Sequence, residues 1–210
     1  MLFQDRLDAG NQLAEKLRKY AKNSNAVLLA LPRGGVAIAL AVAKKLSLPL
    51  DILVARKVGA PGNPEFALGA VTGDGEEYLN ERAWQMYDMD AKLWDRLKAK
   101  EQKEVRRREV AYRGGRSAID LAGKTVILVD DGIATGATMI AAIFSAKKRG
   151  AAKVIAAAPV VAGDTKKLIE SLAEVVFVAA PADFAAVGRF YDNFTQVTDD
   201  EVIAILKNYL

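Results

Sequence analysis

Short, uninterrupted apolar segments recur along the chain and alternate with longer amphipathic ones. The apolar segments cover residues 26–31, 52–55, 125–129, 154–158 and 175–178. Such continuous runs predict strands buried on both faces, because a half-exposed strand would alternate apolar and polar residues. Helix-length stretches lie between them, at residues 36–45, 137–149, 164–171 and 199–209. This order predicts an α/β fold with a doubly wound, mainly parallel sheet flanked by helices.

The remaining segments interrupt that alternation. Residues 5–22 carry apolar side chains at three- and four-residue steps, which predicts an amphipathic helix. Residues 67–79 predict two strands joined at the turn TGDG, and residues 90–112 predict a long, charge-dense helix. Between the sheet and this hairpin, residues 59–66 (GAPGNPEF) hold too many glycines and prolines for a regular element. We expect one domain, residues 1–210, in which residues 59–116 form a flap and a basic helix.

Composition narrows the chemistry. The chain has 210 residues, 51% of them hydrophobic, which is enough to bury one full core. It contains no cysteine and no histidine, which excludes disulfides, thiolate nucleophiles, Cys/His zinc sites and imidazole-dependent triads. Charges occur within the first six residues and no apolar run approaches a membrane span, so we expect a soluble cytoplasmic protein without a membrane partner.

Residues 126–138, VILVDDGIATGAT, combine a buried strand, two aspartates and a loop of small residues that enters a helix. Such a loop exposes backbone N–H groups at the positive end of the helix dipole, where a phosphate binds well. Gly136 permits close approach, and Thr135 and Thr138 offer hydroxyl groups. Asp130 and Asp131 would repel a phosphate, so they suit vicinal ribose hydroxyls or a hydrated cation. A triphosphate loop would need a lysine after the glycine, and none is present there.

A second candidate phosphate loop, residues 31–36 (LPRGGV), also joins a strand to a helix. The Arg33 guanidinium and the amides of Gly34 and Gly35 could bind a diphosphate. Arg56 and Lys57 follow the next predicted strand, and of these two we favour Lys57 as a further ligand of the diphosphate.

The segment 126–138 resembles the phosphoribosyl pyrophosphate motif of type I phosphoribosyltransferases, and Arg33-Gly34-Gly35 resembles the pyrophosphate loop of that family. The resemblance implies that Asp130 and Asp131 bind the ribose as catalytic residues and hold Mg²⁺, through water. It implies pyrophosphate binding by the second loop with Lys57, and a mobile hood at residues 59–66. The residues implied for the 5-phosphate are Ala134, Thr135, Gly136, Ala137 and Thr138.

Residues 181–191, PADFAAVGRFY, are similar to the segment that closes over the base in hypoxanthine-type members. Phe184 is the candidate for stacking on a base and Val187 for reading its edge, with Phe190 and Tyr191 as second choices. Members that use 6-oxopurines commonly carry an aspartate where this chain has Ala134. Proton transfer then falls to Asp130, Asp131, Glu65, the pyrophosphate or water, and the acceptor stays open.

We therefore expect a Mg²⁺-dependent phosphoribosyltransferase whose partners are small molecules, phosphoribosyl pyrophosphate and a nitrogenous base. Residues 92–116 contain ten Lys/Arg and four Asp/Glu, and such a helix is most often a solvated face, so we do not expect nucleic acid as a partner. The alternative is a non-catalytic phosphoribosyl-binding regulator that contacts RNA or a protein. A phosphoribosyl-handling hydrolase ranks last, because no nucleophile elbow occurs. Homodimers are common in the resembling family, and this question stays open.

Overall fold

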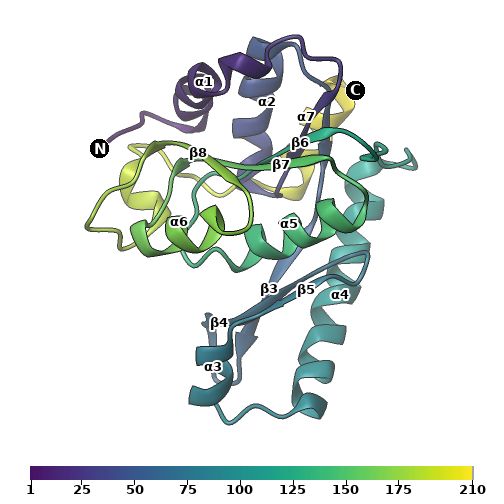
Figure 1. Ribbon diagram of the computed structural model, residues 1–210, viewed down its shortest axis with the longest axis vertical. Helices are drawn as coiled ribbons and strands as arrows, with labels where there is room; N and C mark the ends of the chain where they lie inside the picture. Colours follow the sequence, from purple (N-terminus) through teal and green to yellow (C-terminus); the bar gives the residue numbers. More distant parts are fainter. Residues whose placement is uncertain (210) are drawn as a thin grey trace.

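A parallel five-stranded sheet forms the centre of the protein (Figure 1). The structure is a computed structural model that describes residues 1–209, with the side chain of Glu65 outside the description. The fold class predicted from the apolar runs is confirmed. The strands, in their spatial order, are β2 (Leu50–Ile52), β1 (Ala26–Ala30), β6 (Thr125–Val129), β7 (Lys153–Val160) and β8 (Glu174–Ala179).

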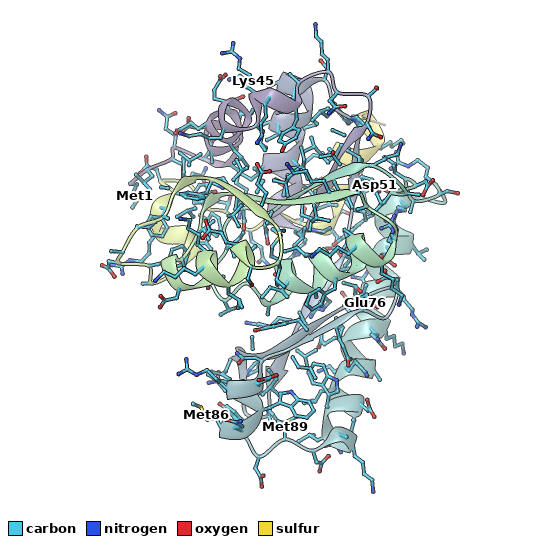
Figure 2. The ribbon with its side chains drawn as sticks, in the orientation of Figure 1. Met1, Lys45, Asp51, Glu76, Met86 and Met89 are labelled. Atoms are coloured by element: carbon cyan, nitrogen blue, oxygen red, sulfur yellow. The ribbon has the colours of Figure 1, made fainter. Side chains whose placement is uncertain are left out.

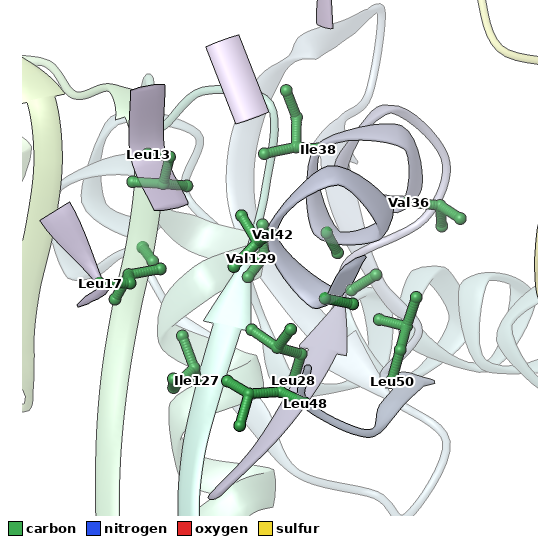
Figure 3. Packing of buried hydrophobic residues seen from close by; sticks show 14 of the residues in the cluster. Leu13, Leu17, Leu28, Val36, Ile38, Val42, Leu48, Leu50, Ile127 and Val129 are labelled. Carbon is green, nitrogen blue, oxygen red and sulfur yellow. The ribbon is translucent and has the colours of Figure 1, made fainter. Parts of the chain in front are cut away.

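Helices cover both faces of this sheet, which explains why its strands are continuously apolar. Leu28 of β1 and Ile127 of β6 face a cluster that also contains Leu13, whereas Val27 and Val126, one residue earlier on each strand, face the opposite cluster. Figure 3 shows the first cluster. The helices on that face are α1 (Arg6–Lys16), α2 (Gly34–Leu46) and α7 (Asp199–Tyr209), and those on the other are α5 (Ala137–Lys148) and α6 (Gly163–Glu170).

A smaller antiparallel unit, here called the hood (residues 55–113), extends from the body (Figure 1). It has its own core around Trp94, Val58 and Leu68. Figure 2 shows Met86 and Met89 at its far end. The elements of the hood are β3 (Ala55–Ala60), β4 (Asn63–Thr72), β5 (Glu77–Leu79), α3 (Glu81–Met86) and α4 (Ala91–Arg113).

The prediction of an irregular loop at residues 59–66 is wrong. β3 and β4 form a hairpin there, and its turn uses Gly62 at φ +76°. A Cβ on Gly59 would overlap the Pro64 carbonyl oxygen, so the two strands approach closely at a register shift. The glycines and the proline therefore serve a bulged strand pair. The apolar run 52–55 is likewise divided, since Ile52 ends β2 and Ala55 begins β3.

Other predicted boundaries agree with the structure. β4 and β5 are the predicted hairpin, and α4 begins where the Asp90 side chain accepts a hydrogen bond from Leu93 N. The first helix is shorter than predicted, because α1 ends at Lys16 and a 3₁₀ turn, η1 (Arg18–Tyr20), follows. In the part of the chain that the structure describes, no helix combines the length and the apolar character of a membrane span.

Candidate functional site

The carboxyl ends of β1, β6 and β7 meet at one edge of the parallel sheet, which is where open α/β sheets bind ligands. The loop after β6 is fastened to β7 there. Asp130 N donates to Ala157 O (3.1 Å) and Ile133 N to Val160 O (2.9 Å). The loop after β6 therefore has a defined backbone.

The loop after β6 turns into α5 at Gly136, which has φ +77°. A Cβ at this glycine would lie 2.6 Å from Thr165 Cγ2, so both the positive φ and the lack of space for a side chain require glycine. Among the described residues, no side chain caps the N-terminus of α5, and Ala134 and Thr135 are exposed. The loop predicted for the 5-phosphate thus leads from two exposed residues into a helix N-terminus whose first backbone N–H groups have no intrahelical partner.

The two aspartates before this loop have different partners. Asp131 Oδ2 accepts hydrogen bonds from Arg6 Nε (3.0 Å) and Arg6 Nη2 (2.8 Å), whereas Asp130 Oδ1 accepts one from the Asp131 amide (2.8 Å). Burial raises the pKa of Asp130 well above its ordinary value, and the charge of Asp131 adds to this rise. Burial also raises the pKa of Asp131, against the opposing charge of Arg6. Sequence reasoning missed Arg6, because no local motif marks it.

The loop between β1 and α2 lies directly against these carboxylates. A Cβ on Gly34 would overlap Asp131 Oδ2, and one on Gly35 would lie 2.5 Å from the Val129 carbonyl oxygen. Both glycines are therefore required for this close approach. The Pro32–Arg33 peptide bond is cis. The structure thus brings the Arg-Gly-Gly segment and the aspartate pair together, as the sequence predicted.

The charged side chains expected at the diphosphate occupy different places. Arg33 Nη1 lies 3.6 Å from Asp199 Oδ1, at the beginning of α7. Sequence reasoning placed Lys57 just after a parallel strand, but it lies within β3, opposite Ala70 of β4. Lys57 therefore belongs to the hood.

The segment expected at a base packs over the loop after β6. Val187 begins a 3₁₀ turn, η2 (Val187–Phe190). Its side chain packs closely on Gly132, because a Cβ added to that glycine would overlap Val187 Cγ1. The rings of Phe184 and Phe190 are 5.2 Å apart, and both pack against the body. Tyr191 is buried and donates to Asp131 O (2.6 Å), so its position is structural, and burial raises the pKa of its hydroxyl.

Several cations of α4 form ion pairs within the protein. Arg107 bonds both Glu104 and Asp199, and Arg108 also bonds Glu104. Hydrogen bonds from Arg107 and then Arg108 lower the pKa of Glu104 to about 2. The bond from Arg107 to Asp199 joins α4 to the start of α7, so this part of the basic helix has a structural role.

Among the described residues, no group of three or more carboxylates gathers as an all-protein metal cage. Mg²⁺ commonly binds through one or two carboxylates together with water and substrate phosphates. The aspartate pair, at a sheet edge between two loops with backbone amides, fits that kind of site.

A family model and curated relatives both match this chain. The chain matches the phosphoribosyl transferase domain family over residues 2–193. A Mycobacterium tuberculosis protein with the provisional name of phosphoribosyl transferase is 47% identical over 206 residues, which cover 98% of this chain and 46% of the relative. The chain thus spans about half the length of the curated relatives it matches.

Solved structures extend the similarity to three dimensions. The crystal structure of TT1426 from Thermus thermophilus has a TM-score of 0.83 and 44% identity, covering 100% of this chain and 99% of that one. A hypoxanthine phosphoribosyltransferase from Staphylococcus aureus has a TM-score of 0.50 and 12% identity, covering 88% of this chain and 79% of that one. The second similarity concerns the fold alone.

Proposed function

The chain belongs to the phosphoribosyl transferase domain family, and from that premise we propose that it transfers the 5-phosphoribosyl group of phosphoribosyl pyrophosphate to a nitrogenous acceptor, releasing pyrophosphate. One observation carries the proposal. The uncapped N-terminus of α5 and the Arg33-Gly34-Gly35 loop lie on either side of one aspartate pair, with the Gly34 backbone packed against Asp131. A sugar that bears one phosphate at C5 and a diphosphate at C1 needs phosphate sites at both ends.

The 5-phosphate binds at the N-terminus of α5. Backbone amides of residues 134–138 point at its oxygens, and the hydroxyls of Thr135 and Thr138 add donors. Ala134 and Ala137 leave the approach free of bulk. Gly136, at φ +77°, sets the direction of the chain as it enters the helix.

The ribose hydroxyls lie at the aspartate pair, and the carboxylates of Asp130 and Asp131 would hold a hydrated Mg²⁺ there. When bound, the ion neutralises the negative charge that develops on the departing pyrophosphate. Arg33, Gly34, Gly35 and Lys57 bind the pyrophosphate itself, for which Arg33 leaves Asp199.

The reaction breaks the bond between C1 and the pyrophosphate oxygen, and a nitrogen of the acceptor forms the new bond at C1. Positive charge grows on the sugar ring in the transition state, next to the two aspartates. Catalysis then comes from holding both reactants in place and from charge stabilisation. No histidine is present to take the acceptor's proton, so pyrophosphate, water or a site carboxylate receives it.

The acceptor lies between the exposed Ala134 and the segment 181–191. Phe184 and Val187 are its proposed contacts, through ring stacking and through the backbone at its edge. Ala134 provides no carboxylate for proton exchange with a 6-oxopurine, which favours acceptors that ionise or lose a proton to solvent.

Calorimetry with phosphoribosyl pyrophosphate and Mg²⁺ tests the proposal directly. Wild type should bind, and the Thr135→Val/Thr138→Val variant should bind at least about tenfold more weakly, because two donors to a charged phosphate are lost. Ser171→Ala serves as the control, since the Ser171 hydroxyl donates to Leu168 O, a local contact at the end of α6. Acceptors are then screened by pyrophosphate release. Folded wild-type protein that does not bind the ligand would contradict the proposal.

A further inference from the structure

The aspartate pair after β6 receives a dedicated counter-charge from outside the motif. Arg6, the first residue of α1, reaches Asp131 across 125 positions of sequence. Its Nε and Nη2 both bond the same oxygen, Asp131 Oδ2, at 3.0 and 2.8 Å. The side chains of Arg6 and Asp131 are only 11% and 16% exposed. The pair is therefore a buried, charge-assisted contact at the ligand edge.

Arg6 is itself fixed from two further directions. Its Nη1 donates to the Thr195 carbonyl oxygen (2.7 Å), and its guanidinium lies over the Phe194 ring, 4.0 Å from the centroid. Both residues belong to the segment that leads into α7. An arginine held by a carboxylate, a carbonyl and an aromatic face has little freedom to leave the site.

Asp131 is held as firmly as its partner. Tyr191 donates to its carbonyl oxygen (2.6 Å), and the missing Cβ of Gly34 leaves the space that Oδ2 occupies. The carboxylate thus joins α1, the loop after β1 and the segment 187–195. Removing any one of these contacts would loosen the loop that the family's motif defines.

Asp130 differs in charge balance. Its Oδ1 accepts a neutral backbone N–H, from Asp131. Within residues 1–209, no lysine or arginine forms an ion pair with Asp130. Asp131 Oδ2 is thus occupied by a guanidinium, whereas Asp130 has only a neutral partner and lies next to the Gly35 backbone.

We propose that Arg6 is a positioning residue of the ribose site: it neutralises and anchors Asp131, so that Asp130 is the carboxylate that accepts the ribose hydroxyls. This inference rests on the proposed function and divides the roles of the two aspartates. It also makes α1 part of the site, because Arg6 is placed by α1, whose N-cap Asp5 accepts from Asp8 N.

The test compares the affinities of ribose 5-phosphate and 2-deoxyribose 5-phosphate, which differ by one hydroxyl. Calorimetry on wild type should give an affinity ratio of about 10 to 100, the range for one hydrogen bond to a charged group. Asp130→Asn should bring this ratio to within about threefold of unity. Arg6→Gln combined with Asp131→Asn keeps a hydrogen-bonding pair without charges and should leave the ratio within about threefold of wild type.

The Arg6→Ala variant distinguishes a positioning role of Arg6 in ribose recognition from a role in stability alone. Without Arg6, Asp131 Oδ2 loses both of its side-chain donors and is free to compete with Asp130 for the ribose hydroxyls, so the ratio should change by about fivefold or more. A folded Arg6→Ala protein with the wild-type ratio would overturn the positioning role. If this variant does not fold, the neutral double variant decides: a ratio near unity there would show that the charged Asp131 reads the hydroxyl and would overturn the inference.

The two proposals can fail separately. If wild type binds ribose 5-phosphate but Asp131→Asn loses the ratio as completely as Asp130→Asn, only the division of roles is wrong. If folded wild type binds neither sugar phosphate, the proposed function fails and the division of roles fails with it.

Discussion

Two ion pairs lie near the ligand edge of the sheet, and they differ in how far each is removed from water. The side chains of Arg6 and Asp131 are 11% and 16% exposed and meet at 2.8 Å, whereas those of Arg33 and Asp199 are 28% and 32% exposed and lie 3.6 Å apart. Breaking a buried pair leaves an uncompensated charge, whereas a half-exposed pair is screened by solvent. The first pair is therefore a lasting part of the site, and in the proposed function the second pair is the one exchanged for a diphosphate.

The largest effect should follow loss of the buried pair. Arg6→Ala should lower the free energy of unfolding by about 2–3 kcal/mol, somewhat below the usual cost of a broken buried pair because both side chains keep slight exposure. Urea denaturation at neutral pH measures it. Arg18→Ala is the control, since Arg18 is 81% exposed and 3.8 Å from Glu15, and it should change stability by less than about 0.5 kcal/mol. Equal losses in both variants would erase the contrast.

The next effect concerns the contact between the Gly34 backbone and Asp131. A Cβ in Gly34→Ala would displace the carboxylate that Arg6 holds, and overpacking of this kind costs about 1–3 kcal/mol. We expect the affinity for Mg²⁺ and phosphoribosyl pyrophosphate to fall at least about tenfold. Gly163→Ala, at the first residue of α6 where a Cβ meets nothing within 4 Å, should leave affinity unchanged. Wild-type affinity in Gly34→Ala would argue against the close packing of the two loops.

The same contrast separates what sequence could predict from what it could not. The loop after β6 and the Arg33-Gly34-Gly35 loop are local, so their residues and spacing predicted them. Arg6 acts across 125 positions, and its partnership depends on how α1 packs on the sheet. The β3–β4 hairpin was missed because glycine and proline disfavour regular strands locally, whereas the paired strands and the hood core stabilise it. Tertiary contacts decided both cases.

A smaller effect should follow release of Arg33. Asp199→Asn weakens the pair with Arg33 and also the bonds from Arg107 and Tyr112. Pyrophosphate affinity should rise about threefold, because Arg33 no longer has to leave a carboxylate, and stability should fall by no more than about 1 kcal/mol. Calorimetry with pyrophosphate and Mg²⁺ measures the change, with the exposed Asp200→Asn as the control. Weaker binding in Asp199→Asn would mean that Asp199 positions Arg33 for its ligand.

The smallest expected effect is a pH dependence of the free energy of unfolding, which arises from the ion pairs of Glu104. Hydrogen bonds from Arg107 and Arg108 lower the pKa of Glu104 to about 2 in the folded protein. Since the folded pKa lies below the ordinary value, this contribution to stability is present above pH 4.5 and is lost as the pH falls toward 2. Between about pH 6 and about pH 3, wild type should lose up to about 1 kcal/mol more than Glu104→Gln. The exposed Glu81→Gln variant should show the same dependence of stability on pH as wild type. A Glu104→Gln variant with that same dependence would contradict this contribution.

The central claim is that one ligand spans both loops while Arg6 stays on Asp131. A crystal structure with phosphoribosyl pyrophosphate and Mg²⁺ tests it most directly. We expect the 5-phosphate on the backbone amides of residues 134–138, the ribose hydroxyls on Asp130, and Arg33 moved from Asp199 to the diphosphate. A phosphate bound elsewhere, or Arg6 displaced from Asp131 by the ligand, would contradict it.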